Sequence, residues 1–168
     1  LPGWVQFIGS GYIGVIPFSF ILVIAVVVFF HFFLNKTTLG RHIYAVGGNP
    51  EAARLSGIDT KKVLTWVYTI SGLMAGMGGI VLMGRVNAAY PNAGLMYELD
   101  AIAAVIIGGA SFLGGVGTIW GTLIGAMIIA VIRNGLNLLG VAASLQTVVL
   151  GAVIIVAVYI DVLRRKKA

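Results

Sequence analysis

Three uncharged segments constrain this chain more than any other sequence feature. They run over residues 14–34, 63–83 and 144–160, and the first two contain 21 residues each. An α-helix of about 20 residues crosses a hydrocarbon layer of about 30 Å. The chain is 60% hydrophobic and only 10% charged, whereas a soluble domain carries about 25% charged residues. The sequence therefore predicts an all-α, polytopic membrane protein.

A fourth uncharged stretch, residues 101–132, is harder to interpret. Its 32 residues would form a single helix of about 48 Å, which is too long for one span and too short for two full spans with a turn. Glycines are densest at 114–117. We therefore expect two short, glycine-broken helices at 101–112 and 118–132, which are two truncated spans or a re-entrant hairpin. The expected total is about five transmembrane segments.

The basic residues predict how the chain is oriented. Nine of the eleven lie in the loop 35–62 or in the tail 164–167, and Lys and Arg favour the cytoplasmic side of a membrane. We therefore expect this loop and the C-terminus to be cytoplasmic. The region 101–132 then crosses the membrane twice or not at all, and residues 1–13, 84–97 and 133–143 lie outside.

The loop 35–62 contains the pattern of a very short helix. Asn49 is a suitable N-cap, Pro50 suits the first helical position, and Gly57 suits the left-handed conformation after the last turn. Glu51 is favourable near the helix N-terminus and can pair with Arg54 three residues later. Two interpretations remain open, a surface helix that rests on lipid headgroups and a docking element for a cytoplasmic partner.

Four motifs in this chain resemble those of a known family. They are GRHIYAVGGNPEAARLSGI at 40–58, YELDAIAAVIIGG at 97–109, WGTLIGA at 120–126 and NGLNLLGV at 134–141. In this order they resemble the membrane permeases of ribose-type monosaccharide ABC transporters, the inner-membrane components of binding-protein-dependent transport. The resemblance extends over about residues 1–163 and corresponds to the C-terminal half of such a permease.

The resemblance implies a function and a set of partners. The chain would be the C-terminal portion of one transmembrane permease domain (residues 1–168), without its first half, in the inner membrane of a prokaryote. The partners implied are a cytoplasmic ABC ATPase, an extracytoplasmic sugar-binding protein, a second permease copy and membrane lipid, and no nucleic acid. The ATPase-coupling residues implied are Asn49, Pro50, Glu51, Ala52, Arg54, Leu55 and Gly57.

The chain itself is not expected to be an enzyme. It contains no Gly-Lys pair and hence no P-loop for phosphates, so ATP hydrolysis is expected in a partner chain. It contains no cysteine, and His31 and His42 are too far apart for a helical metal pair. We expect no cofactor, no metal and no catalytic residue.

Polar residues at the edges of the apolar segments are candidates for a substrate path or for docking of the binding protein. They are Glu98, Asp100, Asn134 and Asn137, with Gln146 as a further candidate. Carboxylates at membrane depth are costly unless they face protein or water. Glu98 and Asp100 are therefore also expected to pair with Arg85 or Arg133.

Glycine spacing predicts close helix packing. Gly72 and Gly76 form one G-x-x-x-G pattern, and Gly117, Gly121 and Gly125 form two more. Small residues four apart allow another backbone to approach. The approaching helix belongs either to the same chain or to a second copy.

Other transport functions remain open at this point. One is a related permease for branched-chain amino acids or nucleosides. Another, from a different class, is an ion-coupled secondary transporter or channel, in which broken helices also mark a binding site. A membrane scaffold without transport activity is the third. Sugar selectivity is expected to lie largely with the binding protein, so this sequence predicts no particular sugar.

Overall fold

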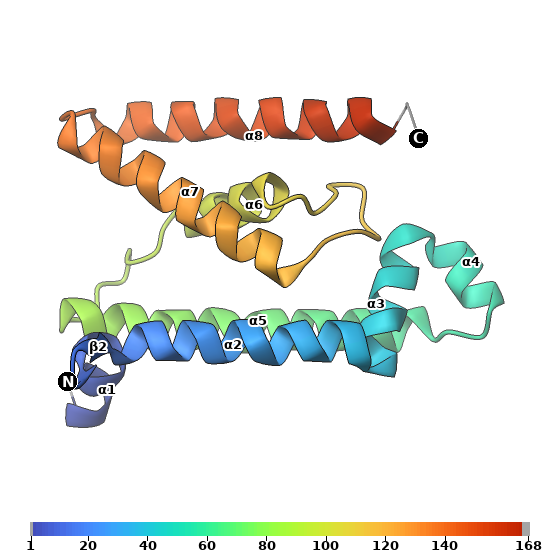
Figure 1. The fold of residues 1–168 in the computed structure, drawn as a ribbon, viewed down its shortest axis with the longest axis horizontal. Helices are drawn as coiled ribbons and strands as arrows, with labels where there is room; N and C mark the ends of the chain where they lie inside the picture. The colour runs from blue at the N-terminus through green and yellow to red at the C-terminus, as the bar shows by residue number, and fades with distance from the viewer. Residues whose placement is uncertain (1, 166–168) are drawn as a thin grey trace. The chain divides into compact units, whose positions relative to one another are not determined.

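The computed structural model describes residues 2–165, and most of these are helical (Figure 1). The elements are α1 (Gly3–Ser10), β1 (Tyr12–Ile13), β2 (Ile16–Pro17), α2 (Phe18–Lys36), α3 (Thr38–Gly48), α4 (Pro50–Leu55), α5 (Thr60–Val86), α6 (Tyr97–Ile107), α7 (Ile119–Leu138) and α8 (Ala143–Arg165). They form two compact units. The first contains Leu1–Ile43 and Glu51–Leu95, and the second contains Tyr44–Pro50 and Met96–Ala168. The predicted all-α class is confirmed.

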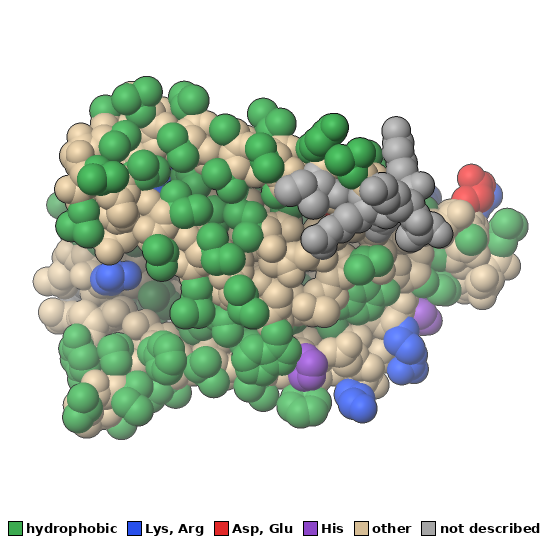
Figure 2. All heavy atoms as spheres, turned by 45° about the horizontal axis from the view of Figure 1, so that its top comes forward, with side chains coloured by type: hydrophobic (Ala, Val, Ile, Leu, Met, Phe, Trp, Pro, Cys, Tyr) green, Lys and Arg blue, Asp and Glu red, His purple; other side chains and the backbone are tan. Residues whose placement is uncertain are grey.

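Four helices of the described chain are long and apolar enough to cross a membrane. They are α2, α5, α7 and α8, and between 6% and 12% of the residues in their apolar windows are buried. Hydrophobic side chains cover much of the face shown in Figure 2, where charged side chains are few. Exposed apolar helices of this length are stable in lipid, because all their backbone hydrogen bonds are internal. The chain is a multi-pass membrane protein.

The region 101–132 differs in detail from the expectation. The first helix, α6, has 11 residues and extends about 16 Å, which is too short to cross. The second, α7, does not end at residue 132 but continues to Leu138 and reaches 20 residues. Arg133 does not end the helix, because its charge is paired with Asp100. The region thus supplies one short helix and one helix of full spanning length.

The other spanning helices also extend beyond the uncharged segments. α5 includes Lys61, Lys62 and Arg85, and α8 continues to Arg165. α2 begins at Phe18, after a hairpin that pairs Ile13 with Ile16. Charged residues are tolerated at helix ends because long side chains reach the membrane interface. Of the basic tail, Lys166 and Lys167 lie outside the described residues.

In the first unit, α1 packs against the C-terminal end of α5. Gly9 and Gly84 are both buried, and their backbones are so close that a Cβ on either would clash. This packing places α1 beside the C-terminal end of α5. The side of the membrane on which residues 1–13 and 84–97 lie stays a prediction.

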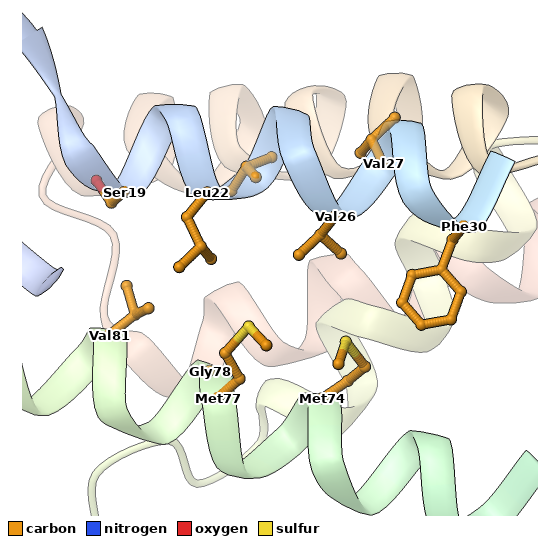
Figure 3. Close-up of a pocket in the computed structure, with 10 residues that line it drawn as sticks. Ser19, Leu22, Val26, Val27, Phe30, Met74, Met77, Gly78 and Val81 are labelled. Atoms are coloured by element: carbon orange, nitrogen blue, oxygen red, sulfur yellow. The ribbon is translucent and has the colours of Figure 1, made fainter. Parts of the chain in front are cut away.

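α2 and α5 are separated by an apolar cavity of about 390 Å³. Leu22, Val26 and Phe30 of α2 face Met74 and Met77 of α5 across it (Figure 3). The lining offers almost no polar groups. The cavity is suited to apolar occupants rather than to a hydroxyl-rich ligand, because a buried hydroxyl without a partner is unfavourable.

In the second unit, α6, α7 and α8 pack around a small apolar core. Ala103 and Ala104 of α6, Ile129 of α7 and Leu150 of α8 are its buried members. α6 and α7 are antiparallel, with Gly121 against Gly108 and Gly125 against Ala104. Packing within the chain is therefore confirmed for this glycine pattern. Gly72 and Gly76 of α5, in contrast, have no neighbour among the described residues that a Cβ would meet.

Candidate functional site

The loop 35–62 is more ordered than the sequence suggested, because it contains α3 before the expected short helix. Thr37 caps α3: its Oγ1 donates to the Phe33 carbonyl oxygen at 2.6 Å and accepts from the Gly40 amide at 3.1 Å. This helix was missed in the sequence. The signal was the apolar spacing of Leu39, Ile43 and Val46, which repeats at helical intervals.

α4 forms where the short helix was predicted, directly after Asn49 and with Pro50 at its first position. Glu51 and Arg54 form the expected pair, with Oε1 and Nη2 3.4 Å apart. Their side chains are 78% and 69% exposed, so the pair adds little stability. The C-terminal end of α4 is held more firmly, by backbone hydrogen bonds.

Gly57 ends α4 in the left-handed conformation, as predicted. Its φ is +84°, its amide donates to the Arg54 carbonyl, and the Ile58 amide donates to the Ala53 carbonyl, both at 3.0 Å. These two bonds define a Schellman motif. A residue with a branched Cβ cannot adopt this conformation without strain, so the end of α4 depends on glycine.

The residues predicted to couple to an ATPase lie on the exposed surface of α4 and its ends. Ala53 is buried at 5% exposure, whereas Leu55 is 81% exposed. All seven predicted coupling residues are exposed: Asn49, Pro50, Glu51, Ala52, Arg54, Leu55 and Gly57. A rigid helical turn with an exposed leucine between charged groups is suited to insertion into a groove of another protein.

Asp59 sets where α5 begins, two residues after Gly57. Its carboxylate accepts a hydrogen bond from the Lys62 amide at 3.1 Å and pairs with the Lys62 ammonium at 3.3 Å. The amide hydrogen bond, then the ammonium, lower the pKa of Asp59 below its usual 3.8. The carboxylate is therefore charged at neutral pH and serves as the N-cap of α5.

The candidates for the substrate path are divided by the structure into paired and unpaired residues. Asp100 Oδ1 accepts hydrogen bonds from Arg133 Nε at 3.1 Å and Nη2 at 2.7 Å. The Asp100 and Arg133 side chains are 20% and 32% exposed. Of the two expected partners, Arg133 is the one used. Glu98 is exposed and forms no ion pair within residues 2–165.

Asn137 belongs to a hydrogen-bonded group at the turn between α7 and α8. The side-chain amide of Gln146, only 7% exposed, donates to Asn137 Oδ1 and to the Val141 carbonyl, both at 2.8 Å. These bonds satisfy the buried amide and hold the turn. Asn134 is exposed one turn earlier on α7. The structure thus unites Asn137 with Gln146 but does not add Asn134 or Glu98 to the group.

The functional candidates in the second unit lie at the two ends of α7. Tyr44, in the part of α3 that precedes α4, donates a hydrogen bond to the Gly117 carbonyl at 2.9 Å, just before α7 begins. Asp100, Arg133 and Asn137 lie toward the other end of this 20-residue helix. An α-helix of this length extends about 30 Å. The Tyr44 contact lies at one end of α7, and the polar groups lie toward the other end.

These features define a polytopic membrane protein with a short, exposed helix between two spans. Comparison with known proteins then identifies the family. Residues 2–158 match the family of the branched-chain amino acid transport system / permease component. The chain belongs to this family of transport permeases.

Several curated relatives are sugar permeases. The ribose import permease protein of Haemophilus influenzae is 45% identical over 122 residues, which cover 73% of this chain and 38% of the relative. The xylose transport system permease protein of the same organism is 46% identical over 153 residues, 90% of this chain and 40% of the relative. The ribose import permease protein of Escherichia coli is 54% identical over 98 residues, 58% of this chain and 30% of the relative.

The chain therefore spans about two fifths of the length of the first two relatives. No solved structure matches the chain.

Proposed function

We propose that this chain is part of the transmembrane permease subunit of an ATP-driven importer for a monosaccharide such as ribose. The observation that carries the proposal is the similarity to permeases named for ribose, xylose and galactose import, at 45–54% identity. The four spanning helices and the polar end of the second unit are suited to a gated path for a neutral, hydroxyl-rich solute.

The proposed role of α4 is to bind a cytoplasmic ABC ATPase. Its support is the exposure of all seven residues from Asn49 to Gly57 that the sequence analysis singled out. The Schellman end fixes the direction of the exposed edge. A rigid helix transmits displacement of a bound partner, whereas a flexible loop would absorb it. Catalysis of ATP hydrolysis would belong to that partner.

The proposed orientation puts the loop 35–62 and the C-terminus in the cytoplasm of a prokaryote. Its support is that the last turn of α3 and the described end of α8 both contact the segment between α6 and α7 within the second unit. Tyr44 contacts Gly117, and Asp161, near the end of α8, accepts a hydrogen bond from Ser111. The polar end with Asp100, Arg133 and Asn137 would then face outward, where an extracytoplasmic sugar-binding protein delivers its cargo.

The proposed assembly contains two permease copies in the lipid bilayer, with this chain as the C-terminal portion of each permease domain. The open glycine face of α5, at Gly72 and Gly76, is compatible with contact to another helix. In the substrate path, Glu98 and Asn134 are the candidates for direct contact, because Asp100 and Asn137 already have partners.

A second candidate substrate class is branched-chain amino acids, which the family description names. Nucleosides are a further possibility within the same architecture. A carrier or channel driven by an ion gradient has less support, because the carboxylate of Asp100 at the polar end is neutralised by Arg133.

The central experiment is co-purification of the permease with its ATPase subunit, followed by uptake of labelled ribose, xylose and leucine in vesicles. We expect ATP-dependent sugar uptake and loss of ATPase association when residues 49–57 are replaced by a Gly-Ser linker. Replacement of residues 89–95, a turn in the first unit, is the matched control. Leucine uptake would favour the second candidate, and ATPase binding without residues 49–57 would contradict the role of α4.

A further inference from the structure

The segment between α6 and α7 forms a closed turn built on glycine. We call residues 111–117 the glycine loop. Its ends are joined by a hydrogen bond from the Ser111 amide to the Val116 carbonyl at 2.9 Å, and the Gly114 amide donates to the Ser111 carbonyl at 3.1 Å. Gly114 and Gly115 have φ of +89° and +75°, a conformation that favours glycine. The loop therefore has a defined shape.

The glycine loop packs directly on the last turn of α3. A Cβ added to Gly47 would lie 2.9 Å from the Gly115 nitrogen, and one added to Gly115 would lie 2.7 Å from the Gly48 Cα. Backbone thus meets backbone, with no flexible side chain between them. The Tyr44 hydroxyl adds a hydrogen bond to the Gly117 carbonyl at 2.9 Å. Movement of this end of α3 must displace the loop, because closely packed backbone cannot be compressed.

The other side of the glycine loop is attached to α8. Asp161 Oδ2 accepts hydrogen bonds from the Ser111 hydroxyl at 2.9 Å and from the Phe112 amide at 3.3 Å. A carboxylate acceptor makes these bonds stronger than neutral ones. The loop is also covalently continuous with α6 and α7. It therefore joins the last turn of α3 to all three helices of the second unit.

α4 follows this contact almost immediately in the chain. Only Asn49 separates Gly48 from Pro50, and the Asn49 amide donates to the Ala45 carbonyl at 3.0 Å. The connection between α3 and α4 is therefore short and hydrogen-bonded. If a bound partner displaces α4, the last turn of α3 should move with it, because the connection between them is too short to absorb the displacement.

We propose that the glycine loop transmits movement of the ATPase-docking helix to α6, α7 and α8, with Tyr44 and Asp161 as positioning residues. This inference rests on the proposed function. It separates two steps, docking of the ATPase on α4 and conversion of its movement into rearrangement of the path. Damage to the loop interrupts the second step and leaves the first intact.

The test uses the permease assembled with its ATPase and binding protein. The variants are Tyr44→Phe, Asp161→Ala and Gly115→Ala, and the matched control is Gly109→Ala. Gly109 also has a positive φ, +87°, but a Cβ there meets nothing. Both alanines are strained because both positions have a positive φ, but only Gly115→Ala also adds a collision with α3. The measurements are ATPase co-purification, thermal stability, and sugar molecules imported per ATP hydrolysed.

We expect the three loop variants to bind the ATPase normally and to import fewer sugars per ATP. The decrease in Tyr44→Phe should be roughly fivefold, the factor of one lost hydrogen bond. Gly109→Ala should retain the wild-type ratio. Equal ratios in the loop variants, the control and the wild type would overturn the inference. If a loop variant is less stable than the control, Tyr44→Phe decides, since it removes one hydroxyl. Failure of the wild type to bind the ATPase would refute the proposed function instead.

Discussion

The Arg133 guanidinium donates two hydrogen bonds to a single oxygen of Asp100, at 3.1 and 2.7 Å, and so joins α7 to α6. The pair lies where the short helix α6 begins. Asp100 is in the first turn of α6, where a negative charge is also favourable for the helix dipole. This contact explains why a helix in an apolar segment continues through an arginine.

Breaking this pair is expected to destabilise the permease. Asp100→Asn leaves the Arg133 charge without its counter-ion, at a cost of about 3 kcal/mol for an unpaired charge at membrane depth. The double variant Asp100→Asn with Arg133→Gln removes both charges and should recover most of the stability. Thermal unfolding in detergent measures the difference. Glu98→Gln, at an exposed position of the same turn, is the control and should have no effect on stability.

Two substitutions of Gly57 test whether ATPase binding depends on the backbone conformation at the end of α4 or on the absence of a side chain there. Gly57→Val cannot adopt φ +84° without strain, so the last turn of α4 should lose its Schellman bonds and ATPase association should fall. Gly57→Asn is the matched control, because asparagine tolerates the left-handed conformation. Co-purification measures both variants. Equal loss of association in both would mean that the glycine surface, not the helix end, is recognised.

Substitution of Gln146 is expected to lower stability, whereas substitution of Asn134 is expected to change sugar uptake. Gln146→Leu leaves Asn137 Oδ1 and the Val141 carbonyl without their donor and should cost about 1–3 kcal/mol of stability. Asn134→Ala, at an exposed position, should leave stability unchanged and raise the sugar concentration needed for half-maximal uptake. Thermal unfolding and transport kinetics check the two expectations. Unchanged uptake kinetics in Asn134→Ala would remove Asn134 from the path.

Acid is expected to release the first turn of α5. The pKa of Asp59 is lowered in the folded protein by its hydrogen bond to the Lys62 amide. Its stabilising effect is therefore complete above the ordinary value of 3.8 and is lost as the pH falls through the lower folded pKa. Hydrogen exchange at the Lys62 amide measures this loss. The Gly121 amide, bound to the Thr118 hydroxyl at 3.1 Å, is the control because that cap does not titrate.

Local sequence signals predicted α4 well. Asn49, Pro50 and Gly57 specify where a short helix begins and ends through their own backbone preferences, so no distant contact was needed. The spans were predicted for the same kind of reason, since their length follows from the thickness of the membrane. The sequence did not predict which face of α4 is exposed. The structure shows that Ala53 is buried and that Leu55 is exposed.

Helix ends beside charged residues were predicted less well. Pairing of Asp100 with Arg85 or Arg133 was expected, but no local pattern chose between the two arginines. The end of α7 was therefore placed at the charged Arg133, six residues too early. Likewise, α3 was missed in a loop that is polar on average. The end of α7 depends on a tertiary ion pair. The formation of α3 depends on apolar residues along one face of the helix, which average composition hides.

The amino-acid sequence alone determined the class of this protein, the approximate spans and the ends of α4, because hydropathy and capping act over a few neighbouring residues. Only the tertiary structure determined that Asp100 pairs with Arg133, that Gln146 holds Asn137, and that the glycine loop packs on α3 and binds Asp161. These contacts join residues far apart in the chain. They depend on how antiparallel helices align, which no local pattern specifies.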